Sequence, residues 1–139
     1  MNNKNKLRII AAIEAVVAVF MFLAVTKIAP VCGGMLELVS GKQVHMKCWY
    51  AANVFVFIAI VLLINAVLSL IVKPSVVSGI MTIVVALLVY ATLNDAFGVG
   101  ICANPDMACQ MTAPYIKVCA VVEIICGIAY TLIAKKEEK

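Results

Sequence analysis

Cysteine is the residue type in this 139-residue chain that is best suited to chemistry, and six cysteines are present. Four of them fall, two and two, in the loops between long apolar runs: Cys32, Cys48, Cys102 and Cys109. In an oxidising compartment such thiols pair into two disulfides, for which three connectivities are open. Pairing within each loop is the simplest arrangement, whereas pairing between the loops would tie different helices together. The pattern predicts two disulfide staples.

Redox catalysis is a second interpretation of the same cysteines. Four-helix membrane oxidoreductases that exchange disulfides beside a quinone use a Cys-x-x-Cys pair, whose short loop makes a reactive thiol easier to arrange. Here the loop cysteines are 16 and 7 residues apart, and the chain contains no Cys-x-x-Cys pair. A quinone-linked thiol–disulfide oxidoreductase is therefore an alternative, and the sequence does not favour an enzyme.

A soft metal ion is a third interpretation. Thiolate and thioether sulfurs select Cu(I) over harder ions, and the two loops also hold four methionines and the single histidine. The predicted metal ligands are His45, Met46, Cys48, Met107, Cys109 and Met111. A metal site and the disulfides compete for the same thiols, so both interpretations stay open.

The elements that carry these residues follow from composition. The chain is 65% hydrophobic and 13% charged, whereas a soluble domain carries about 25% charged residues. Four apolar runs are each about 20 residues long, the length that a helix needs to cross a bilayer. They cover residues 9–28, 50–72, 76–96 and 115–134. The sequence predicts an all-α membrane protein, an antiparallel four-helix transmembrane bundle that forms one domain over residues 1–139.

Lysine and arginine predict the orientation of this bundle. Seven of the eleven lie beside the termini or in the short connection between the second and third runs, and four lie on the other side. Because such residues accumulate on the cytoplasmic side, both termini are expected in the cytoplasm of a prokaryotic cell. The basic residues form no basic face, so the expected partner is the lipid bilayer and not nucleic acid.

Loops 29–49 and 97–114 are then expected outside, as a cysteine-containing cap. The first loop is predicted to form a short β-hairpin. Its turn is expected at Gly41-Lys42, because glycine at the first central position suits a two-residue hairpin turn. The second loop is rich in glycine and proline and is expected to be irregular.

Polar side chains within the apolar runs are costly in lipid and usually face the bundle interior. Cys119, Glu123 and Cys126 share one face of the last run. Glu123 indicates a proton relay or cation site or, more simply, a hydrogen bond to a neighbouring helix or subunit. Glu14 lies about 7 Å inside the first run by helical rise, with Asn65 as its candidate partner. Glu14 and Glu123 enter from opposite sides and are expected at different depths, so they do not form an obvious carboxylate pair.

The loop motifs resemble those of a family of small four-span prokaryotic membrane proteins, a domain-of-unknown-function family. The matching stretches are Met46-Lys47-Cys48, Gly98-Val99-Gly100-Ile101-Cys102 and Pro105-x-Met107-x-Cys109. Length and the four-span plan match as well, so the resemblance covers nearly the whole chain. The family tends to carry His and Thr after Met-x-Cys and Arg after the last loop cysteine, where this chain has Trp49, Tyr50 and Gln110.

Members of that family are often encoded beside permeases of lipoprotein-type ABC exporters, so the resemblance implies an accessory transporter subunit. The residues agree, since the sequence contains no nucleophile–base constellation and no phosphate-binding glycine loop. We therefore predict a small non-enzymatic membrane subunit that works with a transporter or as a homo-oligomer. No cofactor is expected.

Overall fold

The computed structural model describes residues 2–31, 33–73, 75–94, 96, 98–100, 102 and 104–137. The main elements are the helices α1 (Asn3–Leu23), α2 (Lys47–Ile71), α3 (Val76–Thr92) and α4 (Ala108–Glu137). A π-helix, η1 (Ala24–Ile28), extends α1, and strands β1 (Met35–Glu37) and β2 (Gln43–His45) form a hairpin in the first loop. The predicted four-helix, mainly α architecture with a short hairpin is confirmed.

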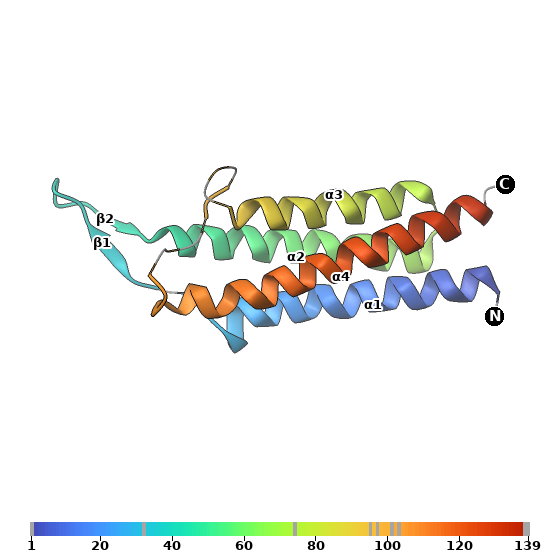
Figure 1. The fold of residues 1–139 in the computed structure, drawn as a ribbon, viewed down its shortest axis with the longest axis horizontal. Coiled ribbons are helices and arrows are strands. Elements are labelled where there is room, and N and C mark those ends of the chain that lie inside the picture. The colour runs from blue at the N-terminus through green and yellow to red at the C-terminus, as the bar shows by residue number, and fades with distance from the viewer. Residues whose placement is uncertain are drawn as a thin grey trace.

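The four helices form one elongated bundle (Figure 1). Helix α1 packs against α2 and α4, and α3 packs against the same two helices. Both termini and the α2–α3 connection lie at one end of the bundle, which we call the terminal end. The hairpin and the α3–α4 connection lie at the opposite end, which we call the thiol end because it carries Cys48, Cys102 and Cys109.

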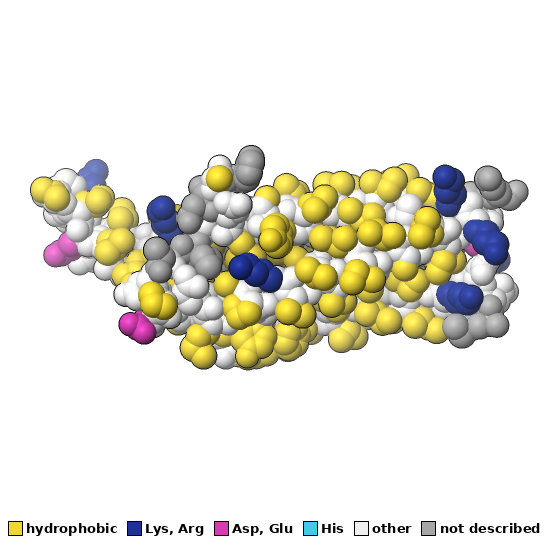
Figure 2. Space-filling view, viewed as in Figure 1, with side chains coloured by type: hydrophobic (Ala, Val, Ile, Leu, Met, Phe, Trp, Pro, Cys, Tyr) yellow, Lys and Arg dark blue, Asp and Glu magenta, His cyan; other side chains and the backbone are white. Residues whose placement is uncertain are grey.

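Three helices are long and apolar enough to cross a membrane: Asn3–Ile28, Lys47–Ile71 and Ala108–Glu137. Helix α3 is also apolar but has 17 residues, the lower limit of the usual spanning length. Figure 2 shows hydrophobic side chains along the visible face of the bundle, with Lys and Arg side chains at the terminal end and others toward the thiol end. Helices suit lipid because each satisfies its own backbone hydrogen bonds. These features are those of a multi-pass membrane protein.

Small residues allow close packing between α3 and α4. A Cβ atom added to Gly127 would lie 2.8 Å from the Ile83 side chain and 3.1 Å from the Gly79 carbonyl oxygen. A Cβ atom added to Gly79 would lie 2.9 Å from the Thr131 backbone nitrogen. Glycine at these two positions therefore lets the helix backbones approach, as small residues do in membrane helix pairs.

Helix α4 begins earlier than the sequence predicted. It starts at Ala108 and contains Pro114, so the prediction of an irregular loop is wrong for residues 108–114. Proline in that position removes one intrahelical hydrogen bond, which membrane helices tolerate when neighbouring groups supply other contacts. Near this proline, the Thr112 hydroxyl donates to the carbonyl oxygen of Ala29 (2.5 Å), which ties the start of α4 to the end of η1.

The hairpin is present, but its turn differs from the predicted one. The strands pair antiparallel with Met35 opposite His45 and Glu37 opposite Gln43, so residues 38–42 connect them. Gly41 donates from its N–H to the Leu38 carbonyl oxygen (2.8 Å) and has a φ of 75°. Gly41 therefore follows the turn instead of opening it, and the hairpin has one of the longer loops in which glycine takes the left-handed position.

Candidate metal centre

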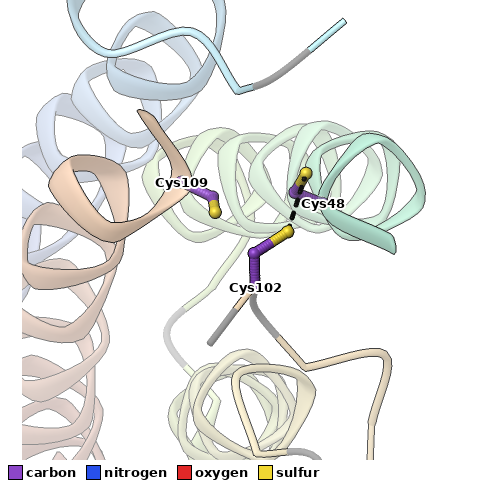
Figure 3. Close-up of side chains that lie close together, drawn as sticks. All are labelled: Cys48, Cys102 and Cys109. Atoms are coloured by element: carbon purple, nitrogen blue, oxygen red, sulfur yellow. Dashed lines mark hydrogen bonds between the residues drawn. The ribbon is translucent and has the colours of Figure 1, made fainter. Parts of the chain in front are cut away.

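Three cysteine side chains from separate segments meet at the thiol end (Figure 3). Cys48 lies in the first turn of α2, Cys109 in the first turn of α4, and Cys102 in the segment before α4. Their Sγ atoms all lie within 4.8 Å of one another, and the Cys102 thiol donates to the Cys48 Sγ at 3.4 Å. Cys48 and Cys109 are 0% and 1% exposed, while Cys102 is half-buried. Together they form a thiol cluster that solvent reaches from one side.

The segment after α3 folds back to place Cys102 in this cluster. The N–H of Gly98 donates to the Asn94 carbonyl oxygen (2.8 Å), and the N–H of Gly100 donates to the Thr92 carbonyl oxygen (3.1 Å). Gly100 has a φ of 69°, which glycine adopts at little steric cost. A Cβ atom on Gly98 would lie 2.5 Å from the Thr92 Cα. Both glycines of the Gly-x-Gly motif are therefore required by the backbone path.

The first turn of α4 connects this segment to the helix that carries Cys109. The side-chain amide of Gln110 donates to the carbonyl oxygen of Cys102. Because Gln110 follows Cys109 directly, this hydrogen bond sets the position of one cysteine relative to the other. Gln110 stands where the resembling family usually carries arginine, which also donates hydrogen bonds.

The helix ends give the cluster a favourable electrostatic environment for anions. Cys48 and Cys109 are each the second residue of a helix. A helix N-terminus carries roughly half a positive elementary charge and N–H groups without intrahelical partners. Two such termini stabilise a centre with net negative charge, as three thiolates around a monovalent cation would be.

The spacing of the sulfurs fits a three-coordinate metal ion. An ion bound about 2.3 Å from three sulfurs in one plane holds those sulfurs about 4.0 Å apart. The three Sγ atoms already lie within 4.8 Å of one another, so binding requires only small side-chain movements. Thiolates select soft ions such as Cu(I).

The same distances bear on the predicted disulfides. The Cys48–Cys102 sulfur separation of 3.4 Å is longer than the bond length of about 2.05 Å, so this pair is not at bonding distance. It also joins the two loops, whereas pairing within each loop is the simplest expectation. Cys32, the partner that the simplest pairing gives to Cys48, lies outside the described residues. The disulfide staples stay a prediction.

Two further predicted ligands have other contacts in the first loop. The His45 ring stacks on Trp49, with ring centroids 4.3 Å apart. The Met46 side chain packs against Gly34, since a Cβ atom added to that glycine would lie 3.2 Å from the Met46 Cε. The group of mutually close His, Cys, Asp and Glu ligand atoms in the described part of the chain does not contain His45.

The two methionines of the second motif also differ in position. Met111 is 69% exposed and lines a recess with Phe20 and Tyr115, on a surface that the thiol cluster does not share. Met107 is half-buried just before α4 begins. Of the predicted metal ligands, the structure brings together Cys48 and Cys109, and it adds Cys102.

Glu14 and Glu123 both face the bundle interior, with exposures of 3% and 0%. The two side chains interact electrostatically, although the sequence indicated no obvious carboxylate pair. Helix α1 starts at Asn3, so Glu14 lies about 16 Å from the terminal end by helical rise. Glu123 lies about 21 Å before the last residue of α4 on the same basis. Helix α1 begins six residues before the apolar run, so its polar first turns lie at the terminal end.

The remaining polar groups predicted inside the membrane lie around this pair. The Asn65 amide donates to the Thr82 hydroxyl oxygen (2.9 Å), and the Thr82 hydroxyl lies near Glu14 and donates to the Ser78 carbonyl oxygen (3.2 Å). Thr82 therefore lies between Asn65 and Glu14. Cys119 is buried and Cys126 is half-buried on the α4 face that carries Glu123.

A family profile described as a domain of unknown function, DUF4418, matches residues 14–134. The chain belongs to the DUF4418 family. The matched residues of this DUF4418 chain include the thiol cluster and both buried glutamates, so each feature lies within the family's domain. Neither the curated proteins nor the solved structures contain a match. Membership gives a family and no activity, so a function has to be argued from the side chains.

Sequence reasoning missed Cys102 as a member of the metal ligand set. It was grouped with Cys109 as a disulfide pair, because both were assigned to one irregular loop. The Gly98-x-Gly100 motif was the available signal, since closely spaced glycines often mark a backbone that turns sharply or approaches another segment. That signal suggests a fold-back, but it does not name the neighbour that the returning cysteine reaches.

Proposed function

We propose that this DUF4418 chain is a small membrane protein that binds a thiophilic metal ion, with Cu(I) as the preferred ion, through Cys48, Cys102 and Cys109. The observation that carries the proposal is the mutual approach of the three Sγ atoms to within 4.8 Å. Burial of two of the thiols and their position at helix N-termini support it, because both features favour a compact, negatively charged centre.

Cu(I) suits this ligand set better than Zn²⁺ does. Structural zinc sites are almost always four-coordinate and tetrahedral. Among the described residues, the group of close His, Cys, Asp and Glu ligand atoms has three members. Soft thiolate ligands select Cu(I), and three thiolates can complete its coordination without a fourth ligand.

The location of the site follows from the predicted orientation. With both termini in the cytoplasm of a prokaryotic cell, the thiol end faces the outside of the cytoplasmic membrane. An accessory role beside a transporter such as an ABC exporter, as the family resemblance implies, would then place the metal centre on the outer face of that assembly. Co-purification of the tagged protein from its native membrane, with and without copper, tests that part of the proposal.

Metal titration tests the proposal directly. The reduced, full-length protein in detergent is titrated with Cu(I) under anaerobic conditions against a chromogenic Cu(I) chelator. We expect one tightly bound equivalent, and none at the same chelator concentration when all three cluster cysteines are replaced by serine. The matched control replaces Cys119 and Cys126 by serine and should keep the bound equivalent. Equal binding by both variants would contradict the proposal.

Thiol–disulfide exchange is a second candidate, favoured by the 3.4 Å approach of Cys48 and Cys102. Oxidation would join the two sulfurs and release two protons and two electrons to an acceptor such as a quinone, after which the Cys109 thiolate could attack the new bond. Intact mass after alkylation without reductant separates the candidates. A Cys48–Cys102 bond that forms when quinone is added and is reduced again when a dithiol substrate is added favours exchange, whereas reduced thiols with bound copper favour the metal centre.

A further inference from the structure

A second group of ionisable side chains lies inside the bundle, and the proposed metal centre does not use it. The buried polar residues of the described chain are Glu14, Thr82, Thr112 and Glu123, and none of them is basic. Glu14 of α1 and Glu123 of α4 interact electrostatically. Two carboxyl groups therefore share an apolar interior without a buried cationic side chain from any described residue.

These carboxyl groups are poorly satisfied by hydrogen bonds. Both carboxyl oxygens of Glu123 and one oxygen of Glu14 have no hydrogen-bond partner within the described part of the chain. An unpaired charge at this depth is expensive, and so is a buried polar atom without a partner. A proton on each carboxyl group removes its charge and supplies a donor for a neighbouring oxygen. The pair is therefore built to hold protons.

The polar side chains near this pair come from α2, α3 and α4. Helix α2 contributes Asn65 and Ser69, and α3 contributes Ser78 and Thr82, all of which are uncharged. The titratable neighbours lie on α4, which is the helix that carries Glu123. They are Cys119, Cys126 and Tyr130. None of these described neighbours carries a carboxyl group, so Glu14 and Glu123 are the acidic side chains of this part of the interior.

A row of polar side chains leads from Glu14 toward the terminal end. The Thr82 hydroxyl lies near Glu14, donates to the Ser78 carbonyl oxygen (3.2 Å) and accepts a hydrogen bond from the Asn65 amide (2.9 Å). The Ser78 hydroxyl donates to the Asn65 side-chain oxygen (3.1 Å), and the hydroxyls of Ser69 and Ser78 are hydrogen-bonded to each other. These polar groups provide a continuous path along α2 and α3 through an otherwise apolar interior.

The path opens into a recess at the terminal end. Ser69 lines this recess, which has a volume of about 510 Å³, together with Lys4, Arg8, Lys73 and Glu137. The recess therefore carries charged side chains and is accessible to water. Water in this recess can meet the Ser69 hydroxyl, where the row of polar side chains that leads toward Glu14 begins.

Apolar packing separates the pair from the thiol end. Phe55, Leu62, Val85, Val89 and Ile116 are buried in one hydrophobic cluster that also contains Cys119, one turn from Glu123 toward the thiol end. Between the carboxyl groups and the thiol cluster, the described interior is thus filled by hydrocarbon side chains. Access to the pair is expected from one side of the membrane.

We propose that Glu14 and Glu123 together form an intramembrane proton-binding site that exchanges protons with the terminal end through Thr82, Asn65, Ser78 and Ser69. The site is distinct from the thiol cluster and needs no metal. Each carboxyl group binds a proton inside the bundle and releases it when the terminal side becomes alkaline.

Infrared spectroscopy of the full chain in lipid vesicles tests this proposal, because a protonated carboxyl group has a carbonyl band distinct from that of a carboxylate. We expect the wild-type protein to show this band at neutral pH and to lose it at alkaline pH. The substitutions Glu14→Gln and Glu123→Gln should each remove part of the band, and the double variant should remove it. Glu37→Gln, at an exposed position on β1, is the matched control and should leave the band unchanged.

Two outcomes overturn the proposal. If wild type and the double variant have the same spectrum in this region at neutral pH, the pair does not hold protons. If the band appears only when Na⁺ and K⁺ are removed, the site holds a metal cation instead. Circular dichroism on each variant checks that the helices are retained.

A separate measurement tests whether protons reach the pair from the terminal end. Ser69→Ala breaks the hydrogen-bonded path at the recess and should slow hydrogen–deuterium exchange of the carboxyl band at least several-fold, while Ser75→Ala, at the N-cap of α3, should not. Equal exchange rates in wild type and Ser69→Ala would show that protons reach the pair by another route.

Should the glutamine variants fail to fold, labelling of the wild type by an apolar carbodiimide, which adds to protonated carboxyl groups, gives a second readout. We expect mapped labels on Glu14 or Glu123 that decrease with rising pH, and absence of such labels contradicts the proposal.

Discussion

The thiol cluster and the buried carboxyl pair both collect ionisable groups from separate segments, but the protein holds them in different ways. The cysteines lie at two helix starts and in a folded-back loop, where solvent reaches Cys102. The glutamates lie inside α1 and α4, where the helix register alone brings them together. Loop contacts therefore determine the first site, and helix packing determines the second.

This difference has consequences for what each group can bind. The thiol end provides soft ligands, partial positive charge from two helix N-termini and an open side through which an ion can enter. The interior provides hard oxygen atoms, no buried basic residue among those described and access limited to a path of hydroxyl and amide groups. The first arrangement suits a soft metal ion, whereas the second suits a proton.

Removal of one cluster thiol is expected to give the largest effect and to leave the carboxyl pair unchanged. Cys109→Ser replaces one of three soft ligands, so we expect the Cu(I) affinity to fall about 1000-fold, or about 4 kcal/mol. Competition with a chromogenic chelator measures the change. Cys126→Ser is the control and should bind Cu(I) like wild type. A loss of affinity in both variants would mean that the cluster is not the binding site.

A larger side chain at the α3–α4 contact should destabilise the helix bundle and leave the thiol cluster intact. Gly127→Val inserts a side chain where a Cβ atom would already lie 2.8 Å from Ile83. Overpacking of this kind costs about 1–3 kcal/mol, so the thermal unfolding midpoint in detergent should fall, with Cu(I) affinity nearly retained. Gly33→Ala, at a position with no atom within 4 Å of an added Cβ, should unfold like wild type. A parallel loss of Cu(I) affinity in Gly127→Val would show that the two regions are coupled.

A smaller effect is expected when the connection between Cys102 and α4 is removed. Gln110→Ala deletes the hydrogen bond from its amide to the Cys102 carbonyl oxygen and leaves all three thiols in place. Loss of a group that orients a ligand typically weakens metal binding 10–100-fold, and we expect about 10-fold here because the backbone contacts of Gly98 and Gly100 remain. The same chelator competition measures it. Affinity equal to that of wild type would show that Cys102 is positioned without Gln110.

The smallest effect is expected at His45. Its ring stacks on Trp49 and does not belong to the close group of thiols, so His45→Ala should change the Cu(I) affinity by less than about threefold, or about 0.7 kcal/mol. A decrease of the size expected for Cys109→Ser would place His45 among the ligands after all, as the sequence pattern first indicated.

The sequence was sufficient to predict the helical architecture, because apolar runs of about 20 residues have few stable alternatives in lipid. It also predicted that Glu123 and Glu14 face inward, since exposure of a carboxyl group to lipid is costly. Helix ends were harder to predict. The first residues of α1 are polar and α4 contains Pro114, so both helices are longer than their apolar runs indicate. Contacts between segments, such as that of Thr112 with Ala29, hold these extensions.

The two sites differ in how far the sequence could predict them. The approach of Glu14 to Glu123 depends on how α1 packs against α4, which the apolar pattern of each run does not specify. The thiol cluster depends on the return of Cys102 over the end of α3, which requires contacts between Gly100 and Thr92. Such long-range contacts do not appear in local patterns, whereas the residue types that could bind a soft metal were already visible.

X-ray absorption at the copper edge, on the full-length protein loaded with one equivalent of Cu(I), tests the central claim most directly. The three-thiolate centre predicts three sulfur atoms at about 2.3 Å from the metal, and the Cys109→Ser variant should not reproduce that shell. A first shell dominated by nitrogen or oxygen, or a three-sulfur shell that survives in the variant, would contradict the assignment of Cys48, Cys102 and Cys109 as the metal centre.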